Sequence, residues 1–198
     1  LKNQSGKLVG QIQAQYAKYL LRLVAPIQLS AYLVSTGIVQ KLVGGITQVA
    51  TAIYPAVSRD SHSTGVRRSY YYLQLGLFCL ALVGVGIYKL VGYQFLTLWL
   101  ANPPLVEIVD KIMSVLVWYF AILVLCPLPS AVLDGSGRPG LTSLFATITT
   151  AIEITLSLVL YKSYGYMAPV YSALVALAIT TPVLLYTTQK VMNSVRVD

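Results

Sequence analysis

The chain has 198 residues, of which 57% are apolar and only 10% are charged, against about 25% charged residues in an ordinary soluble domain. This small number of charged residues cannot cover a water-facing surface. The composition therefore excludes a soluble globular protein. The formal net charge is +8, but the basic residues are scattered through short connections between apolar runs. We therefore expect no nucleic-acid partner.

Apolar runs of the length that a bilayer requires, about 20 residues, recur along the whole chain. In chain order they predict six spans, near residues 6–24, 30–57, 70–90, 108–133, 141–161 and 166–188. We predict helices, because lipid cannot satisfy exposed backbone amides and a β-barrel would show alternating strands. The predicted fold class is an all-α polytopic membrane protein whose six transmembrane helices form a single domain, residues 1–198.

Polar or helix-breaking residues separate the predicted spans. They are Pro26 and the residues at 59–63, 102–104, 134–140 and 164–166. Residues 135–140 match the pattern G-x-G-x-x-G, but they follow a long apolar run instead of a strand, which predicts a tight turn and no dinucleotide site. Pro55, Pro127 and Pro129 predict kinks within spans, which are either hinges or static bends.

The Lys and Arg residues near the span ends predict the orientation. With a cytoplasmic N-terminus, the cytoplasmic side carries Lys2, Lys7, Arg59, Arg67, Arg68, Arg138, Lys190 and Arg196, and the other side carries Lys89, Lys111 and Lys162. Because cytoplasmic loops are rich in Lys and Arg, we predict a multi-pass protein of the cytoplasmic (inner) membrane with both termini in the cytoplasm. Tyr93, Phe95 and Trp99 in an outer connection suit an aromatic belt or a short interfacial helix.

Ionisable side chains lie at mid-depth in three of the predicted spans, although each costs about 2.5–3.5 kcal/mol near the bilayer centre. Helical spacing gathers them into polar stripes, which contain Gln15, Lys18 and Arg22 on the first span, Gln40, Lys41 and Gln48 on the second, and Ser143, Thr147, Thr150, Glu153 and Ser157 on the fifth. A stripe that faced lipid would carry the whole cost, so we expect the three stripes to face one water-accessible cavity.

A structural alternative stays open for the same charges. Lys18 and Arg22 would then extend toward the headgroups, and Glu153 would pair with Lys41. Snorkelling explains Arg22 but not Lys41, which lies in the middle of its span, so we favour the cavity.

The predicted cavity is cationic, because Lys18, Arg22 and Lys41 oppose Glu153 alone. Ammonium and guanidinium groups suit a phosphate or pyrophosphate, and glutamine side chains suit sugar hydroxyls. The predicted substrate-binding residues are Lys18, Arg22, Lys41, Gln15, Gln40 and Gln48, with Glu153 as a candidate for coupling to an ion gradient.

Catalytic and metal-binding patterns are missing from the sequence. His62 has no second His or Cys at metal-ligand spacing, and Ser130 and Ser136 lack a recognisable His and carboxylate partner. We therefore expect no catalytic residue, no enzyme activity, no metal site and no cofactor.

Several short stretches, in their order and spacing, are similar to one transporter family. They are residues 28–32 (QLSAY), 54–59 (YPAVSR), 98–100 (LWL), 132–139 (VLDGSGRP) and 164–171 (YGYMAPVY). Through them the chain, over residues 6–191, resembles the polysaccharide (O-antigen or exopolysaccharide) flippases of the multidrug/oligosaccharidyl-lipid/polysaccharide exporter superfamily. The resemblance implies one lobe of a MATE-like two-lobe transporter, its helices seven to twelve, with the N-terminal lobe apparently absent from this sequence.

The resemblance also implies a function. The expected activity is translocation, by alternating access, of an undecaprenyl-pyrophosphate-linked oligosaccharide for polysaccharide biosynthesis and export. The expected partners are this anionic lipid-linked cargo, membrane lipids, the N-terminal lobe and glycan polymerisation proteins. Two alternatives stay open: a cation-coupled multidrug or metabolite exporter of the same superfamily, and a membrane scaffold subunit that transports nothing.

Overall fold

The structure is a computed structural model that describes residues 12, 15–23, 25–51, 55 and 64–193. Its helices are α2 (Pro26–Thr51), α4 (Thr64–Leu100), α5 (Pro103–Leu123), α6 (Pro127–Gly135), α7 (Pro139–Tyr164), the 3-10 turn η1 (Gly165–Met167) and α8 (Ala168–Asn193). Residues 15–23 are also helical, and the described ranges contain no strand. The predicted all-α fold class is confirmed.

Four stretches of the described chain are long and apolar enough to cross a bilayer. They are Gln28–Gln48, Gly65–Leu100, Pro103–Gly135 and Pro139–Asn193, with mean hydropathies from 1.3 to 2.2. The last stretch holds both α7 and α8, each of 26 residues, and at 1.5 Å per residue each is about 39 Å long, enough to cross alone. The chain is a multi-pass membrane protein.

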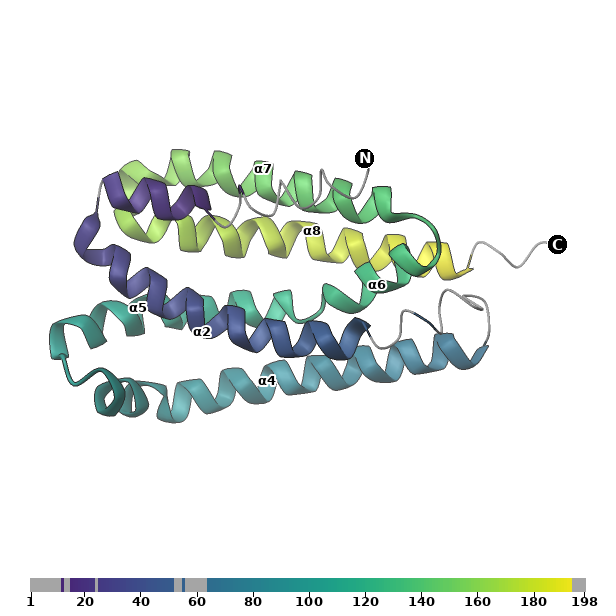
Figure 1. Cartoon of the computed structure of the whole chain (residues 1–198), viewed down its shortest axis with the longest axis horizontal. Helices are drawn as coiled ribbons and strands as arrows, with labels where there is room; N and C mark the ends of the chain where they lie inside the picture. Colours follow the sequence, from purple (N-terminus) through teal and green to yellow (C-terminus); the bar gives the residue numbers. More distant parts are fainter. Residues whose placement is uncertain (1–11, 13–14, 24, 52–54, 56–63, 194–198) are drawn as a thin grey trace.

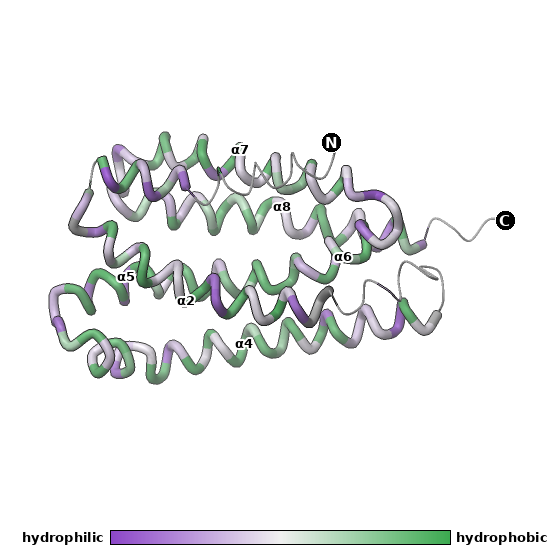
Figure 2. The backbone as a smooth tube through the Cα atoms, viewed as in Figure 1, coloured by the Kyte–Doolittle hydropathy of each residue, from purple (hydrophilic) through white to green (hydrophobic). Residues whose placement is uncertain are grey.

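The long helices lie side by side along one axis (Figure 1), with α7 and α8 on one side, α2 and α5 in the middle, and α4 on the other side. The helix α5 is central, since it packs against α2, α4 and α8. Its buried face, with Val109, Ile112 and Leu116, is part of the largest core cluster. Figure 2 shows apolar residues along most of α4 and α5, and hydrophilic residues along α2.

The outer surface of α4 suits lipid. Its large apolar side chains Leu75, Phe78, Leu82 and Leu90 are each at least 45% exposed, which is unfavourable in water and favourable in hydrocarbon. The helix continues to Leu100, past the predicted end of the third span at residue 90. The aromatic side chains of the predicted outer connection therefore stand on a helix.

The bend predicted at Pro127 and Pro129 is a full break between α5 and α6. Because proline has no N–H, these two residues deprive the carbonyls of Leu123 and Leu125 of their helical donors. The Leu123 carbonyl accepts instead from the Cys126 N–H at 3.0 Å. The Leu125 carbonyl accepts from the Gln74 side-chain amide of α4 at 3.1 Å. A neighbouring helix thus completes the backbone hydrogen bonding of the break.

Glycines make two of the turns. Gly137 has a φ of +73° in the α6–α7 turn, and Gly165 has a φ of +53° between α7 and α8. The residues that match G-x-G-x-x-G thus lie where one helix ends at Gly135 and the next begins at Pro139. This is the tight turn between two helices that the sequence predicted for them.

Parts of the predicted spans and orientation signals lie outside the described residues. These are residues 6–11, 13, 14 and 24 of the first span, residues 52–54, 56 and 57 of the second, and Lys2, Lys7, Arg59 and Arg196 among the basic residues.

Candidate functional site

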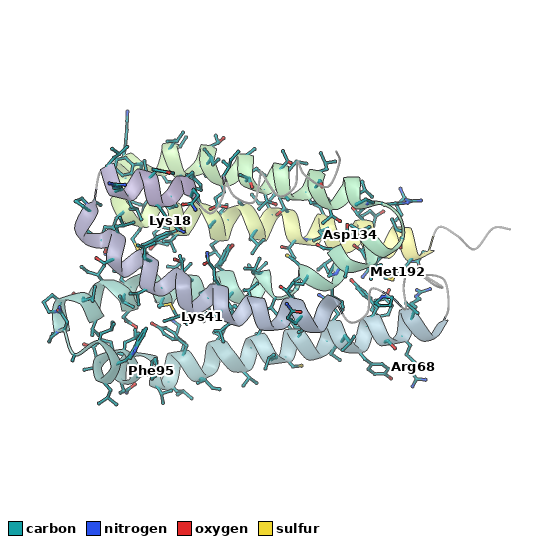
Figure 3. The ribbon with its side chains drawn as sticks, in the orientation of Figure 1. Lys18, Lys41, Arg68, Phe95, Asp134 and Met192 are labelled. Atoms are coloured by element: carbon teal, nitrogen blue, oxygen red, sulfur yellow. The ribbon has the colours of Figure 1, made fainter. Side chains whose placement is uncertain are left out.

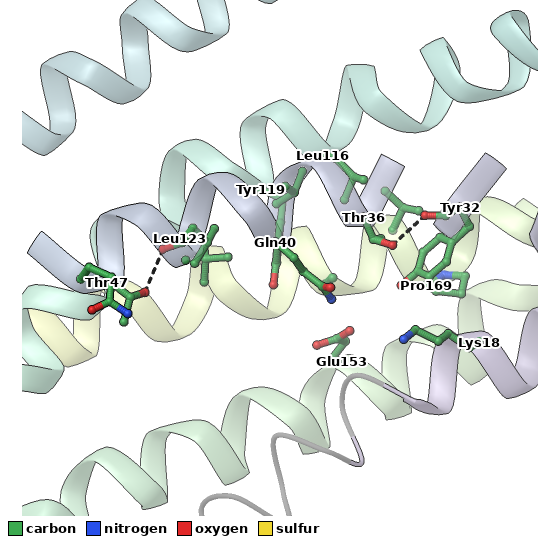
Figure 4. A pocket seen from close by; sticks show the side chains of 16 residues that line it. Lys18, Tyr32, Thr36, Gln40, Thr47, Leu116, Tyr119, Leu123, Glu153 and Pro169 are labelled. Atoms are coloured by element: carbon green, nitrogen blue, oxygen red, sulfur yellow. Dashed lines mark hydrogen bonds between the residues drawn. The ribbon is translucent and has the colours of Figure 1, made fainter. Parts of the chain in front are cut away.

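A cavity of about 440 Å³ opens between residues 15–23, α2, α5, α7 and α8. This volume is within the usual range of small-molecule sites, about 300–1,000 Å³. Each of these five segments contributes side chains to its wall (Figure 4). Segments that are far apart in the sequence thus meet at one polar site inside an apolar bundle.

The α2 wall follows one row of the helix. Thr36, Gln40, Gly44 and Gln48 line the cavity, and their spacing of four residues places them on the same helical face. A Cβ atom at Gly44 would have no atom within 4 Å, so the absence of a side chain there leaves open space. The two glutamines supply amide donors and acceptors along this row.

Lys18 and Glu153 point toward one another across the cavity (Figure 4). Lys18 comes from the helical segment 15–23 and Glu153 from the middle of α7, where it is only 5% exposed. The Tyr16 hydroxyl donates to Glu153 Oε1 at 3.2 Å, so segment 15–23 contacts this carboxylate through Tyr16. Tyr32 and Tyr119 also line the cavity.

The structure divides the predicted site residues into two groups. Lys18, Gln40, Gln48 and Glu153 line the cavity together. Gln15, Arg22 and Lys41 are exposed and do not line it, and Figure 3 shows Lys18 and Lys41 at separate places on different helices. The described lining therefore carries one positive and one negative group, where the sequence predicted three and one.

Thr36 and Tyr119 line the cavity, although the sequence did not predict them as site residues. Thr36 stands one helical turn before Gln40, so a search at four-residue spacing from that glutamine would have found it. Tyr119 lines the cavity from α5, but no polar stripe accompanies it on that helix, so no sequence signal pointed to it.

Within the described part of the chain, no group of three or more His, Cys, Asp or Glu side chains could hold a metal ion. Cys79 and Cys126 are both free thiols.

The fold is similar to that of solved transporters. One is a multidrug resistance MATE family transporter of the MOP superfamily in an outward-facing conformation, with a TM-score of 0.80 and 17% identity over 92% of this chain and 42% of that one. Another is a MOP superfamily transporter from Pyrococcus furiosus, whose binding pocket is described as having reverse polarity that suggests a different function. Its TM-score is 0.81, with 16% identity over 96% of this chain and 43% of that one.

The chain has the fold of one half of a MATE-type transporter. It spans less than half the length of either similar structure. No protein-family profile and no curated protein sequence matches it. At identities of 16% and 17%, the likeness establishes the fold, and the function has to be argued from the site.

Proposed function

We propose that this chain forms one lobe of an alternating-access transporter whose cavity binds the anionic group of a lipid-linked oligosaccharide. The observation that carries the proposal is the placement of the Lys18 side chain in a 440 Å³ cavity beside Gln40 and Gln48, within a MATE-type lobe. A lysine inside an apolar bundle is costly, and such residues commonly mark substrate pathways.

The chemistry of the wall fits this cargo. An ammonium group binds a phosphate as a point charge, and the glutamine amides can hydrogen-bond sugar hydroxyls. Apolar side chains such as Leu116 and Val170 complete the lining, so an apolar lipid segment also finds contact there.

We further propose that a second lobe faces this cavity, because both similar structures are more than twice as long as the region that the chain matches. The two lobes would rock about the central site to expose it to each side in turn. Gln15, Arg22 and Lys41, exposed in this lobe, remain proposed cargo residues on surfaces that the second lobe would approach. We also propose that the protein lies in the inner membrane with both termini in the cytoplasm. We propose glycan polymerisation proteins as its partners.

Ligand binding by the full-length protein in detergent or nanodiscs tests the cargo. Undecaprenyl pyrophosphate is compared with undecaprenol, which has the same chain and no phosphate. We expect the protein to bind undecaprenyl pyrophosphate and not undecaprenol. In Lys18→Gln we expect the binding free energy to weaken by about 2–5 kcal/mol, which is roughly 30-fold or more in affinity. Lys89→Gln is the matched control, since Lys89 is exposed on α4 away from the cavity. Equal affinity of wild type and Lys18→Gln would refute the proposed role of Lys18.

A cation-coupled multidrug exporter is the second candidate, and the buried carboxylate of Glu153 in the cavity favours it. A lipophilic cation such as a fluorescent dye serves as its probe in the same binding assay. Saturable dye binding that Glu153→Gln abolishes and Lys18→Gln preserves would place this candidate first. Dye binding that is absent from wild type supports the anionic cargo.

A further inference from the structure

A second hollow, of about 440 Å³, lies near the start of α4. Its described lining consists of five exposed residues, Arg67, Arg68, Tyr71, Tyr72 and Leu75. The spacing of four residues from Arg67 to Tyr71 and Leu75, and from Arg68 to Tyr72, places them on one face of the helix. Figure 3 shows Arg68 near this end of α4, at the edge of the bundle. We call this feature the α4 groove.

Each arginine of the α4 groove contacts a tyrosine one helical turn further along. The guanidinium carbon of Arg67 lies 5.9 Å from the centre of the Tyr71 ring, and that of Arg68 lies 5.4 Å from the centre of the Tyr72 ring. Arg68 Nη2 also donates to the Tyr72 hydroxyl at 3.3 Å. A guanidinium group has five N–H donors in a planar fork that matches the oxygens of a phosphate. The tyrosines therefore hold both guanidinium groups at the groove, and Arg68 has donors left for a ligand.

The positive charge of the α4 groove has no counter-charge among the described residues that line it, since they include no Asp or Glu. Three carboxylates elsewhere in the described chain, on Asp110, Asp134 and Glu153, accept hydrogen bonds from side chains of other helices. Glu107 lies near the start of α5, beyond the opposite end of α4. An anion that is not part of the described chain therefore suits the two arginines.

The α4 groove lies at the depth of lipid headgroups. Tyr71 and Tyr93 are exposed on the same helix, and at 1.5 Å per residue they are about 33 Å apart along its axis. This distance matches the roughly 30 Å of hydrocarbon between the two membrane interfaces, where tyrosine is enriched. The two arginines then lie one turn outside the hydrocarbon, at the level of the phosphates, and Leu75 lies one turn inside it, beside the acyl chains.

We propose that the α4 groove binds an anionic phospholipid such as phosphatidylglycerol, with the phosphate on Arg67 and Arg68 and an acyl chain along Leu75. Phosphatidylglycerol has a net negative charge, whereas the choline cation of phosphatidylcholine neutralises its phosphate. Each basic residue near an anionic membrane surface strengthens the attraction roughly fivefold. Contact between Leu75 and the acyl chain favours a lipid over a free phosphate. The groove shares no described lining residue with the cavity of the proposed transport function, so it does not depend on that function.

Native mass spectrometry of the full-length protein in detergent tests the site, with phosphatidylglycerol and phosphatidylcholine of identical acyl chains. We expect the wild type to bind phosphatidylglycerol at least about tenfold more tightly than phosphatidylcholine. We expect Arg68→Gln alone to weaken phosphatidylglycerol binding roughly fivefold, and Arg67→Gln with Arg68→Gln to abolish the preference. Equal binding of the two lipids by the wild type, or an unchanged preference in the double variant, overturns the proposal.

Lys89→Gln with Lys162→Gln is the matched control, because it removes the same number of charges from exposed positions outside the groove. We expect this control to keep the preference for phosphatidylglycerol. An equal loss in the control would show that lipid binding follows net charge, and it would overturn the assignment to the groove. Both double variants change exposed side chains only, and helical circular dichroism checks that each is folded.

Competition with inorganic phosphate separates a lipid site from a site for a soluble anion. We expect phosphatidylglycerol to remain bound to the wild type in a large excess of inorganic phosphate, because the acyl chain contact at Leu75 has no counterpart in the free ion. Displacement of the lipid by inorganic phosphate would assign the two arginines to a soluble anion and overturn the proposal.

Discussion

The hydrogen bond from Gln74 to the α5–α6 break gives a prediction with a worked magnitude. Pro129 has no N–H for the Leu125 carbonyl, and the Gln74 amide of α4 replaces that donor at 3.1 Å. Gln74→Leu removes the bond and leaves the carbonyl without a partner. A net hydrogen bond contributes about 0.5–1.5 kcal/mol in proteins, and measured values in membrane helices average about 0.6 and reach about 1.7 kcal/mol.

A compensating effect limits the cost to about 1 kcal/mol. Gln74 Oε1 is buried without a hydrogen-bond partner in the described part of the chain, so Gln74→Leu also removes an unsatisfied acceptor. Pro129→Ala supplies the missing N–H, because the next residue, Ser130, already bonds the Cys126 carbonyl in helical fashion at 3.1 Å. In the Pro129→Ala background we therefore expect Gln74→Leu to cost nothing or to stabilise.

Reversible unfolding in mixed micelles measures this double-mutant cycle, with helical circular dichroism as the signal. The expected interaction energy is about 1 kcal/mol, a roughly fivefold difference in the unfolding constant. Gln94→Leu, an exposed glutamine on the same helix, controls for the change in hydrophobicity. If Gln74→Leu costs the same in both backgrounds, the amide is not replacing the proline's missing donor and the account of the break fails.

Three further substitutions are expected to lower the free energy of unfolding in the same assay. Tyr88→Phe removes the 2.6 Å bond from its hydroxyl to Asp110 Oδ1 between α4 and α5, at about 1–2 kcal/mol; no change in stability would show that the bond is not formed. Gly165→Ala, at a φ of +53° with open space around it, costs about 1–3 kcal/mol from backbone strain alone, whereas Gly86→Ala in helical α4 stabilises. Ala176→Leu overpacks a residue that is 0% exposed, at about 1–3 kcal/mol.

Much of the fold could be predicted from the sequence because lipid restricts the choices. Long apolar runs have to be helical to satisfy their backbones, and Pro127 and Pro129 disrupt two particular hydrogen bonds wherever their helix packs. The donor that repairs one of them is Gln74, 51 residues away in sequence. That contact depends on how α4 lies against α5, which no local pattern records.

Four residues of the predicted polar stripes, Lys18, Gln40, Gln48 and Glu153, line the cavity, but the stripes could not fix the rotation of each helix. On α2, the residues Ala31, Ser35 and Val39 are buried, and together they mark the face of the helix that points into the bundle. At about 100° per residue, Gln40 lies roughly 140° from the centre of that face in one direction and Lys41 roughly 120° from it in the other, so the two side chains are on different sides of the helix. The predicted stripe contained both residues. With α2 packed against α5, Gln40 lines the cavity and Lys41 does not.

The resulting balance of charge bears on the sign of the cargo. Among the described lining residues, Lys18 and Glu153 are the pair that can carry opposite charges, since tyrosine is ordinarily neutral near pH 7. While Lys18 keeps its proton, the wall has no net charge when Glu153 is ionised and one positive charge when Glu153 is protonated. With Glu153 protonated the wall would attract an anion, and with Glu153 ionised it offers neither an anion nor a cation a net attraction. The proposed anionic cargo therefore depends on the protonation of Glu153 beside Lys18, and it needs neither Arg22 nor Lys41 in the cavity.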